Sequence, residues 1–394
     1  MKKNFHPENI VVFILFLSPK MAGLYIHIPI CKSRCYYCDF YSSTYHGNKG
    51  ELLSAMKKEL ELRAGYLREE AIETIYLGGG TPSLLSVIEL NDLFETVSKY
   101  YNCKIKEITL EGNPEDLTPS YLAALKKLPI SRLSIGIQSF NDNELKSINR
   151  RHSAEVALQC VKNAQETGFH NISIDLIYGL PQQSLSDWNK NLIQAIELNV
   201  PHISAYSLTF EERSLLTKKL QKGEIEETDE EVYLTMFRVL REKLSSAGIL
   251  PYEISNFARP GFESQHNSAY WDAIPYIGIG PSAHSFNGTS RQWNIANSRQ
   301  YIENIHHGKC YFEIEELDLN TRFNEFVMTS LRKCEGINLT SVQKQFGTNY
   351  LSHLTREAKK FVQNGTLMQD KNRIWLTEEG VFISDYIIEE LFLV

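Results

Sequence analysis

From residue 23 onward, short runs of apolar and mostly β-branched residues alternate with longer amphipathic stretches. The runs predict six strands, at Leu24 to Ile28, Thr74 to Leu77, Glu107 to Leu110, Arg132 to Ile137, Ile172 to Ile177 and Ile203 to Leu208. Helical spacing recurs between them, at Gly50 to Ala64, Val87 to Tyr100, Ser153 to Thr167 and Leu185 to Leu198. Each of these stretches is long enough for a right-handed crossover between parallel strands. The pattern therefore predicts an α/β fold built on a parallel sheet, either open or barrel-like.

The pattern also divides the chain into parts, with boundaries that we place at 1–22, 23–250, 251–316 and 317–394. The last part is mainly helical, with a predicted two-stranded wing at Thr366 to Leu376 that is typical of a winged-helix module. Such modules often bind DNA. However, Tyr311 to Val394 contain nine Lys and Arg against thirteen Asp and Glu, a net charge of 9 − 13 = −4. Phosphate binding needs the opposite sign, so we expect a packing or docking domain and no nucleic-acid partner.

Composition excludes several classes of protein. The 394 residues suffice for two or three domains. With 42% hydrophobic and 23% charged residues the chain resembles ordinary folded proteins rather than disordered ones. Its 41 Lys and Arg against 48 Asp and Glu give a net charge of −7, which argues against a protein that coats polyanions.

The amino-terminal part contains an apolar run from Ile10 to Leu17. The run is much shorter than the roughly 20 residues that a membrane-spanning helix needs. No small-residue cleavage site follows it, so a secretion signal is disfavoured. We expect residues 1–22 to be an extension, with Met21 as the natural start, and the protein to be cytoplasmic without a transmembrane span.

The segments that follow the predicted strands contain many residues of the kinds that bind metals or ligands. They read HIPICKSRCYYCDF after the first strand, then GGGTP, EGNPE, GIQSF and DLIYGLP at the ends of the next four. In parallel α/β sheets the functional residues lie on loops at the carboxyl ends of the strands. All five segments should therefore meet at one rim.

Three of the seven cysteines form a C-x3-C-x2-C array in the first of these loops: Cys31, Cys35 and Cys38. Structural zinc usually takes four protein ligands, and His27 is the one nearby candidate for a fourth, so zinc is disfavoured. Three thiolates suit a 4Fe-4S cluster with one iron left open to a small molecule. The remaining cysteines are expected to be small buried residues: Cys103, Cys160, Cys310 and Cys334.

The motifs YIHIPICKSRCYYCDF and YLGGGTP resemble those of the radical S-adenosylmethionine (SAM) superfamily. The resemblance implies a partial TIM-type (β/α)6 barrel with a winged-helix-like carboxyl-terminal domain, a 4Fe-4S cluster on the three cysteines, and SAM bound at the open iron. The glycine turn would contact the methionine amino group, and Glu111 would bind the nucleoside. The implied SAM-binding residues are Tyr25, Gly79, Gly80, Thr81, Glu111, Gln138, Arg150 and Asp175. Whether one or two SAM molecules bind is left open.

Four further segments, PYEISNFARPG, HNSAYW, YIGIGPSAHS and DLIYGLP, are similar to the HemN/HemW branch. One type in this branch is oxygen-independent coproporphyrinogen III oxidase, and the other is a heme chaperone. The oxidase type has a fourth cysteine two places after the third, where this chain has Phe40, and it has a long polar extension that is missing here. Both differences favour the heme chaperone. The oxidase stays as the alternative, so enzymatic activity is undecided, and an enzyme acting on another tetrapyrrole is a third candidate.

The resemblance adds heme and an acceptor protein for heme as partners, with a homodimer as one assembly. His266, in the H-N-x-x-Y-W segment beside Tyr270 and Trp271, is the candidate axial ligand, because neutral imidazole binds heme iron and aromatic rings pack on a flat macrocycle. His202 and His284 are rival ligands. The sequence leaves open the identity of the acceptor, the mode of heme attachment and the cleavage of SAM.

Overall fold

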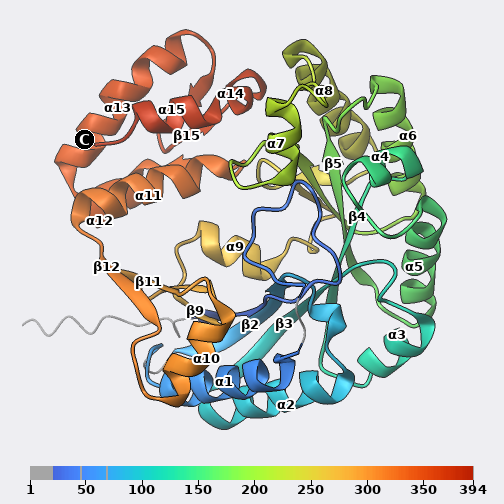
Figure 1. The fold of residues 1–394 in the computed structure, drawn as a ribbon. Helices are drawn as coiled ribbons and strands as arrows, with labels where there is room; N and C mark the ends of the chain where they lie inside the picture. The colour runs from blue at the N-terminus through green and yellow to red at the C-terminus, as the bar shows by residue number, and fades with distance from the viewer. Residues whose placement is uncertain (1–20, 45–46, 68–69, 394) are drawn as a thin grey trace, which may run out of the picture.

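A computed structural model describes residues 21–44, 47–67 and 70–393. The apolar run Ile10 to Leu17 lies outside these residues. The six predicted strands are confirmed as a continuous parallel sheet (Figure 1). They are β1 (Met21–Ile28), β2 (Ala71–Gly79), β3 (Cys103–Gly112), β4 (Arg132–Gln138), β5 (Asn171–Tyr178) and β6 (His202–Ser207).

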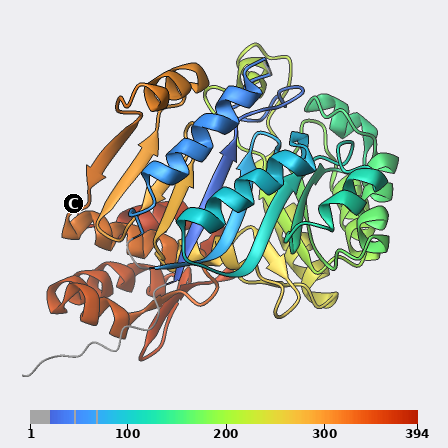
Figure 2. The same cartoon turned by 90° about the horizontal axis from the view of Figure 1, so that it is seen from below.

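Helices follow these strands and cover the outer face of the sheet, as α1 and α2 show most clearly in Figure 2. They are α1 (Lys49–Leu62), α2 (Val87–Tyr100), α3 (Pro119–Leu125), α4 (Asp142–Ser147), α5 (Ala154–Glu166), α6 (Leu185–Glu197), α7 (Leu215–Gln221) and α8 (Glu230–Ser246). The four helices that spacing predicts are α1, α2, α5 and α6, each within two residues at either end. The predicted α/β fold with a partial barrel is thus confirmed.

The segment 251–316 extends both edges of the sheet and contributes a helix between them. Strand β9 pairs in parallel with β1, and β10 to β12 continue that edge, while β8 and β7 join beyond β6. These elements are β7 (Leu250–Pro251), β8 (Asn256–Ala258), α9 (Gln265–Trp271), β9 (Tyr276–Ile279), β10 (His284–Phe286), β11 (Ser290–Asn294), α10 (Ser298–His306) and β12 (Phe312–Glu316). The sheet therefore has twelve strands, six more than the apolar pattern predicts.

The carboxyl-terminal residues build a core of their own around Phe323, Val327, Leu354 and Ile374. The predicted wing is confirmed as β14 and β15, and β13 adds a third strand. The elements are α11 (Leu319–Arg332), β13 (Ile337–Asn338), α12 (Leu339–Phe346), α13 (Thr348–Gln363), β14 (Leu367–Gln369), β15 (Arg373–Leu376), α14 (Glu378–Phe382) and α15 (Ser384–Glu390). This domain contacts the rest of the chain through α11, which packs on α9, and through α14, whose Phe382 ring lies 5.1 Å from the Phe237 ring on α8.

The two faces of the parallel strands differ in chemistry. Apolar side chains such as Leu24, Ile26 and Ile28 pack outward against the helices. The alternate positions are polar and bond to one another across neighbouring strands, as Tyr76 does with Glu111 and Ser134 with Asp175. The barrel therefore encloses a polar lumen inside an apolar shell.

The expectation of four buried cysteines is wrong for two of them. Cys160 is buried on α5 and Cys103 is half-buried, but Cys310 and Cys334 are exposed. Both exposed cysteines lie in short connections, at residues 307–311 and 333–336.

Candidate functional site

The cysteine loop, residues 29–43, follows β1 at the rim and reaches toward α4 and α7 (Figure 1). Its two arms are held together, because the Cys31 N–H donates to the Ser43 carbonyl and the Ser43 N–H to the Pro29 carbonyl. Its tip is fixed to the opposite side of the barrel. There the Tyr36 N–H donates to the Ile148 carbonyl, and the Leu216 N–H donates to the Tyr36 carbonyl.

The three thiols are half-buried and lie beside polar partners. The Thr81 hydroxyl donates to Cys31 Sγ at 3.6 Å, and Arg150 Nη1 donates to Cys35 Sγ at 3.4 Å. Burial raises the pKa of Cys31 and raises that of Cys38 to about 11. Both thiols therefore hold their protons at neutral pH until metal replaces them.

The donor set fits a cluster better than a single ion. Among the described residues, no three His, Cys, Asp or Glu side chains converge on one metal position. A cubane takes each cysteine on a different iron, so its thiolates need not converge on one point. Three neighbouring cysteines on one loop, with a cation at Cys35, suit an iron–sulfur cluster whose thiolates carry negative charge.

Beside the loop, the glycine turn after β2 leaves no room for side chains. A Cβ on Gly80 would lie 2.8 Å from the Ile28 carbonyl oxygen, and Gly79 has a positive φ of 106° with the His27 ring 2.5 Å from any added Cβ. Only glycine adopts this backbone beside the first strand without strain. Thr81 follows, buried, with its hydroxyl directed to Cys31.

Glu111, at the end of β3, lies against this turn. Its carboxylate accepts from the Tyr76 hydroxyl at 2.7 Å and from the Gly79 N–H at 3.2 Å. Burial raises the pKa of Glu111 to about 7, although both hydrogen bonds favour the charged form. The carboxyl group of Glu111 thus faces the lumen, and its pKa lies close to neutral pH.

The structure places the remaining predicted SAM residues around the same rim. Asp175 accepts from the Ser134 hydroxyl at 3.3 Å, and burial raises its pKa to about 6. Arg150 donates to Asn113 Oδ1 at 2.6 Å as well as to Cys35. Tyr25 bonds His27 Nδ1 at 2.9 Å. Gln138 is buried with a positive φ of 70° at a register shift between β4 and β5, a strained backbone of the kind found at functional sites.

His266 lies at the opposite end of the lumen. Its ring, 1% exposed, stacks on Tyr76 at 5.2 Å between centroids. Nδ1 is 2.8 Å from Thr74 Oγ1, and Nε2 is 2.8 Å from the Tyr270 hydroxyl. Burial lowers the pKa of His266 to about 3, so the imidazole is neutral. Both ring nitrogens therefore have partners, and a metal at Nε2 would have to displace Tyr270.

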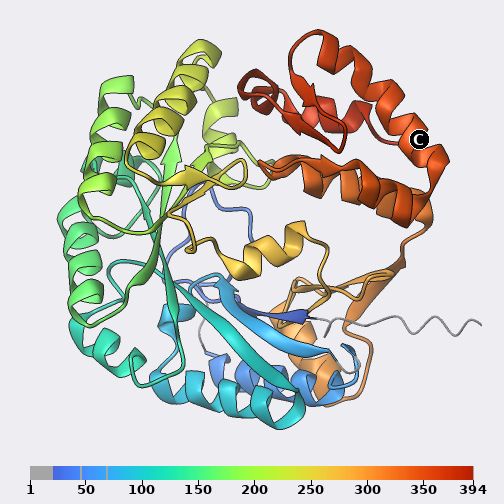
Figure 3. The same cartoon turned by 180° about the vertical axis from the view of Figure 1, so that it is seen from behind.

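Helix α9 closes this end of the lumen (Figure 3). The backbone N–H groups of Gln265 and His266 donate to the Glu107 carboxylate, which ties the start of the helix to β3. Ser264, His202 and Glu107 are all buried around it. The lumen is thus sealed at the amino-terminal ends of the strands, and its partly exposed polar groups lie at the rim.

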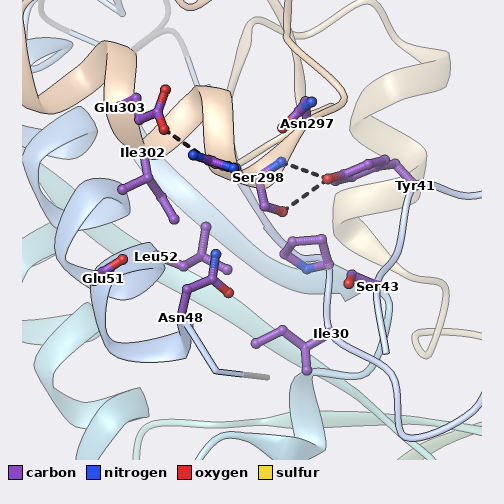
Figure 4. Close-up of a pocket in the computed structure, with 12 residues that line it drawn as sticks. Ile30, Tyr41, Ser43, Asn48, Glu51, Leu52, Asn297, Ser298, Ile302 and Glu303 are labelled. Atoms are coloured by element: carbon purple, nitrogen blue, oxygen red, sulfur yellow. Dashed lines mark hydrogen bonds and ion pairs between the residues drawn. The ribbon is translucent and has the colours of Figure 1, made fainter. Parts of the chain in front are cut away.

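A cavity of about 530 Å³ lies outside the barrel, between the cysteine loop, α1 and α10 (Figure 4). The Tyr41 hydroxyl joins the two sides, because it accepts from the Ser298 N–H at 2.6 Å and donates to Ser298 Oγ at 3.1 Å. Glu51 and Glu303 line the cavity edge. None of the predicted SAM residues lines it.

Sequence reasoning missed four residues that shape the lumen: Thr74, Tyr76, Glu107 and Arg132. The signal was available in the strand segments. Polar residues alternate with apolar ones in T-I-Y-L, E-I-T-L-E and R-L-S-I-G, a period of two that predicts one polar face for each strand. Three parallel strands with this pattern would have indicated a polar interior.

Comparison with known proteins agrees with this geometry. Residues 25–192 match the model of the Radical SAM superfamily, and 317–383 match the HemN C-terminal domain. A protein of Bacillus subtilis (strain 168) named heme chaperone HemW is 31% identical, over 93% of this chain and 98% of the relative. The chain belongs to the HemW family of radical SAM proteins.

Other HemW relatives show similar agreement. The one from Mycobacterium tuberculosis (strain ATCC 25618 / H37Rv) is 32% identical over 94% of each chain. Among solved structures, Escherichia coli coproporphyrinogen III oxidase (HemN), a radical SAM enzyme, superimposes with a TM-score of 0.82 over 95% of this chain and 90% of that chain. Its identity is 22%, so it supports the fold alone. Within the described part of this HemW-family chain, no helix has the length and apolar character to cross a bilayer.

Proposed function

We propose that this HemW-family protein binds heme and passes it to an acceptor protein, and that it carries a 4Fe-4S cluster and SAM. The observation that carries the proposal is Phe40. Its side chain is 69% exposed on the cysteine loop, at the position where the oxidase type has a fourth cysteine. The full-length similarity to proteins named heme chaperone HemW supports the same choice.

In this proposal Cys31, Cys35 and Cys38 hold the cluster. When bound, the cluster would supply an iron with a free coordination position for SAM and an electron source. The protein's own contribution is positioning. The glycine turn at Gly79 and Gly80 would contact the methionine end of SAM, and the carboxylates of Glu111 and Asp175 would bind its polar and positively charged groups from the lumen. The cytoplasm, where thiols stay reduced, is the compartment that this proposal expects.

The three candidate heme ligands differ in accessibility. His202 is buried, with its nitrogens bonded to Ser173 and Tyr252, much as those of His266 are bonded. His284 is exposed on β10 and its ring stacks on Trp293 at 6.2 Å. We keep His266 as the proposed ligand, on the condition that heme displaces Tyr270 from Nε2, and His284 is its rival.

The heme proposal is tested by titrating heme into anaerobically reconstituted protein and recording the Soret band. We expect a stable complex, and we expect His266→Ala to change its spectrum and weaken its affinity. His284→Ala is the matched control, because it removes an imidazole from an exposed site. An unchanged spectrum in His266→Ala, with a change in His284→Ala, would move the ligand to β10.

The alternative function is tested in the same preparation. Coproporphyrinogen III and SAM are added, and protoporphyrinogen is measured. Decarboxylation at enzymatic rates would defeat the heme chaperone proposal and establish the oxidase. If neither heme binding nor decarboxylation occurs, both proposals fail, and an enzyme acting on another tetrapyrrole becomes the next candidate to test.

A further inference from the structure

Arg132 is a buried cation at the closed end of the lumen. It is the first residue of β4, and its side chain is 1% exposed. In register it lies between Thr109 on β3 and Asn171 on β5. Its position therefore places a full positive charge inside the barrel, far from solvent.

This guanidinium is poorly paired. Nε and Nη1 are buried without a hydrogen-bond partner in the described structure, and no carboxylate of the described residues lies within 4.0 Å of it. The neighbouring Thr109 Oγ1 and Asn171 Oδ1 are also buried without partners. An unpaired charge in a low-dielectric interior is destabilising, so the fold retains Arg132 at a cost to its stability.

The groups that face Arg132 come from several elements around the lumen. Tyr76 on β2, Glu111 on β3 and Asp175 on β5 lie within electrostatic reach, as do His202 on β6, Tyr252 before β8 and His266 on α9. Glu107 also lies at this end, where its carboxylate is occupied by the first N–H groups of α9.

These neighbours divide into neutral and acidic groups. Burial, with Arg132 as a second cause, lowers the pKa values of His202 and His266, so both imidazoles stay uncharged. Tyr76 and Tyr252 are neutral because burial raises their pKa values. The acidic groups that respond to Arg132 are the carboxylates of Asp175 and Glu111. Arg150 also lowers the pKa of Asp175, and the charge of Asp175 raises the pKa of Glu111. The neutral phenols of Tyr25, Tyr206 and Tyr270 face these two carboxylates as well.

We propose that Arg132 is a positioning residue for SAM, whose fixed charge favours the ionised forms of Asp175 and Glu111, the forms that can hold the cationic cofactor. The inference rests on the proposed binding of SAM. An ionised carboxylate only accepts hydrogen bonds and attracts the sulfonium, whereas a protonated one donates a hydrogen bond and has lost that attraction. Arg132 touches neither group, so it acts through the field inside the lumen.

The pKa values of Asp175 and Glu111 place the titration of both groups in the physiological pH range. Burial raises the pKa of Asp175 to about 6 and that of Glu111 to about 7, and Arg132 lowers both. Without the cation both pKa values rise further, and both groups are more protonated at neutral pH. SAM affinity should therefore fall at pH 7 and recover as the pH is raised.

The test compares SAM binding to the reconstituted full chain and to Arg132→Gln between pH 6 and 9, by anaerobic equilibrium dialysis. In the unmodified protein, affinity should rise with pH through about 7. In Arg132→Gln we expect about a tenfold loss at pH 7 and near-equal affinity at pH 9, which corresponds to a shift of about one pKa unit. Arg132→Lys, which keeps the charge, should retain the original pH midpoint.

Thr109→Val is the matched control, since it removes a neighbouring orphan hydroxyl without changing charge, and it should leave the pH midpoint in place. Thermal unfolding and iron content of each variant show whether it folds and holds its cluster. A loss of affinity in Arg132→Gln that is equal at all pH values, or no loss, overturns the inference. Failure of the unmodified protein to bind SAM would overturn the proposed cofactor as well, and heme binding is measured separately.

Discussion

The cysteine loop and helix α9 are both singled out by the sequence as ligand sites, and they are built in opposite ways. The loop keeps three half-buried thiols at the rim, next to the tightly packed glycine turn. In α9, His266 is buried, and each of its ring nitrogens has a hydrogen-bond partner. The loop presents its thiols at the partly exposed rim, whereas the imidazole on the helix is enclosed and bonded to Thr74 and Tyr270.

The difference shows that residue type alone does not distinguish a residue that binds a ligand from one that holds the fold together. Cysteines on a loop held at both ends are positioned without being enclosed. An imidazole between Thr74 and Tyr270, stacked on Tyr76, has its position fixed by the fold whether or not a ligand ever reaches it. Variants of the cysteine loop should therefore affect metal content, and variants of α9 should affect the free energy of unfolding.

Single replacement of Cys31, Cys35 or Cys38 by alanine should have the largest effect, on metal content. Each change removes one thiolate of three, so iron and acid-labile sulfide should fall to background after anaerobic reconstitution. The free energy of unfolding without cluster should change by less than about 1 kcal/mol, because the thiols are only partly buried. Cys310→Ala, at an exposed position outside the loop, is the control. Full iron content in Cys35→Ala would rule out the assigned ligands.

His266→Ala should show the reverse pattern, with stability lost and iron kept. The change removes a buried ring and leaves the hydroxyls of Thr74 and Tyr270 without their partner, which should cost about 3 kcal/mol of unfolding free energy. Chemical denaturation measures this loss.

Thr74→Val sharpens the result, since it removes one of the two hydrogen bonds while the ring stays. A loss of about 1 to 2 kcal/mol is expected from the unpaired Nδ1. If His266→Ala unfolds at the same denaturant concentration as the unmodified protein, α9 does not close the barrel in the way we describe.

The smallest effect is expected at the contact between α9 and the carboxyl-terminal domain. Lys333 forms an ion pair with Asp272, at the end of α9, at 2.6 Å, and the two side chains are 23% and 54% exposed. Such partly exposed pairs contribute at most about 1 kcal/mol and are screened by salt. Lys333→Ala should therefore lower the melting temperature slightly at low salt and hardly at all at 1 M salt. A large fall in melting temperature that persists at high salt would mean that Lys333 stabilises the contact by packing rather than by its charge.

The central strands could be predicted from the sequence because each carries an outward apolar face, as Ile26, Leu77 and Ile135 do. The edge strands β10 to β12 could not, because they are three to five residues long and mainly polar or aromatic. Their pairing depends on strands far along the chain rather than on local spacing.

The candidate site shows the same limit. The three cysteines are close in sequence, so their spacing alone indicated a cluster. The surroundings of His266 could not be read in this way, because Thr74 lies 192 positions earlier. Arg132 looked like an ordinary charge at the start of a strand, and only the alternation of polar residues along β4 points it into the barrel.

The closure of one end by α9 leaves one route into the lumen, past the cysteine loop. A cofactor bound at the rim would therefore lie between the solvent and the residues at the closed end, such as His266 and Arg132. It would have to leave before a second ligand could reach them.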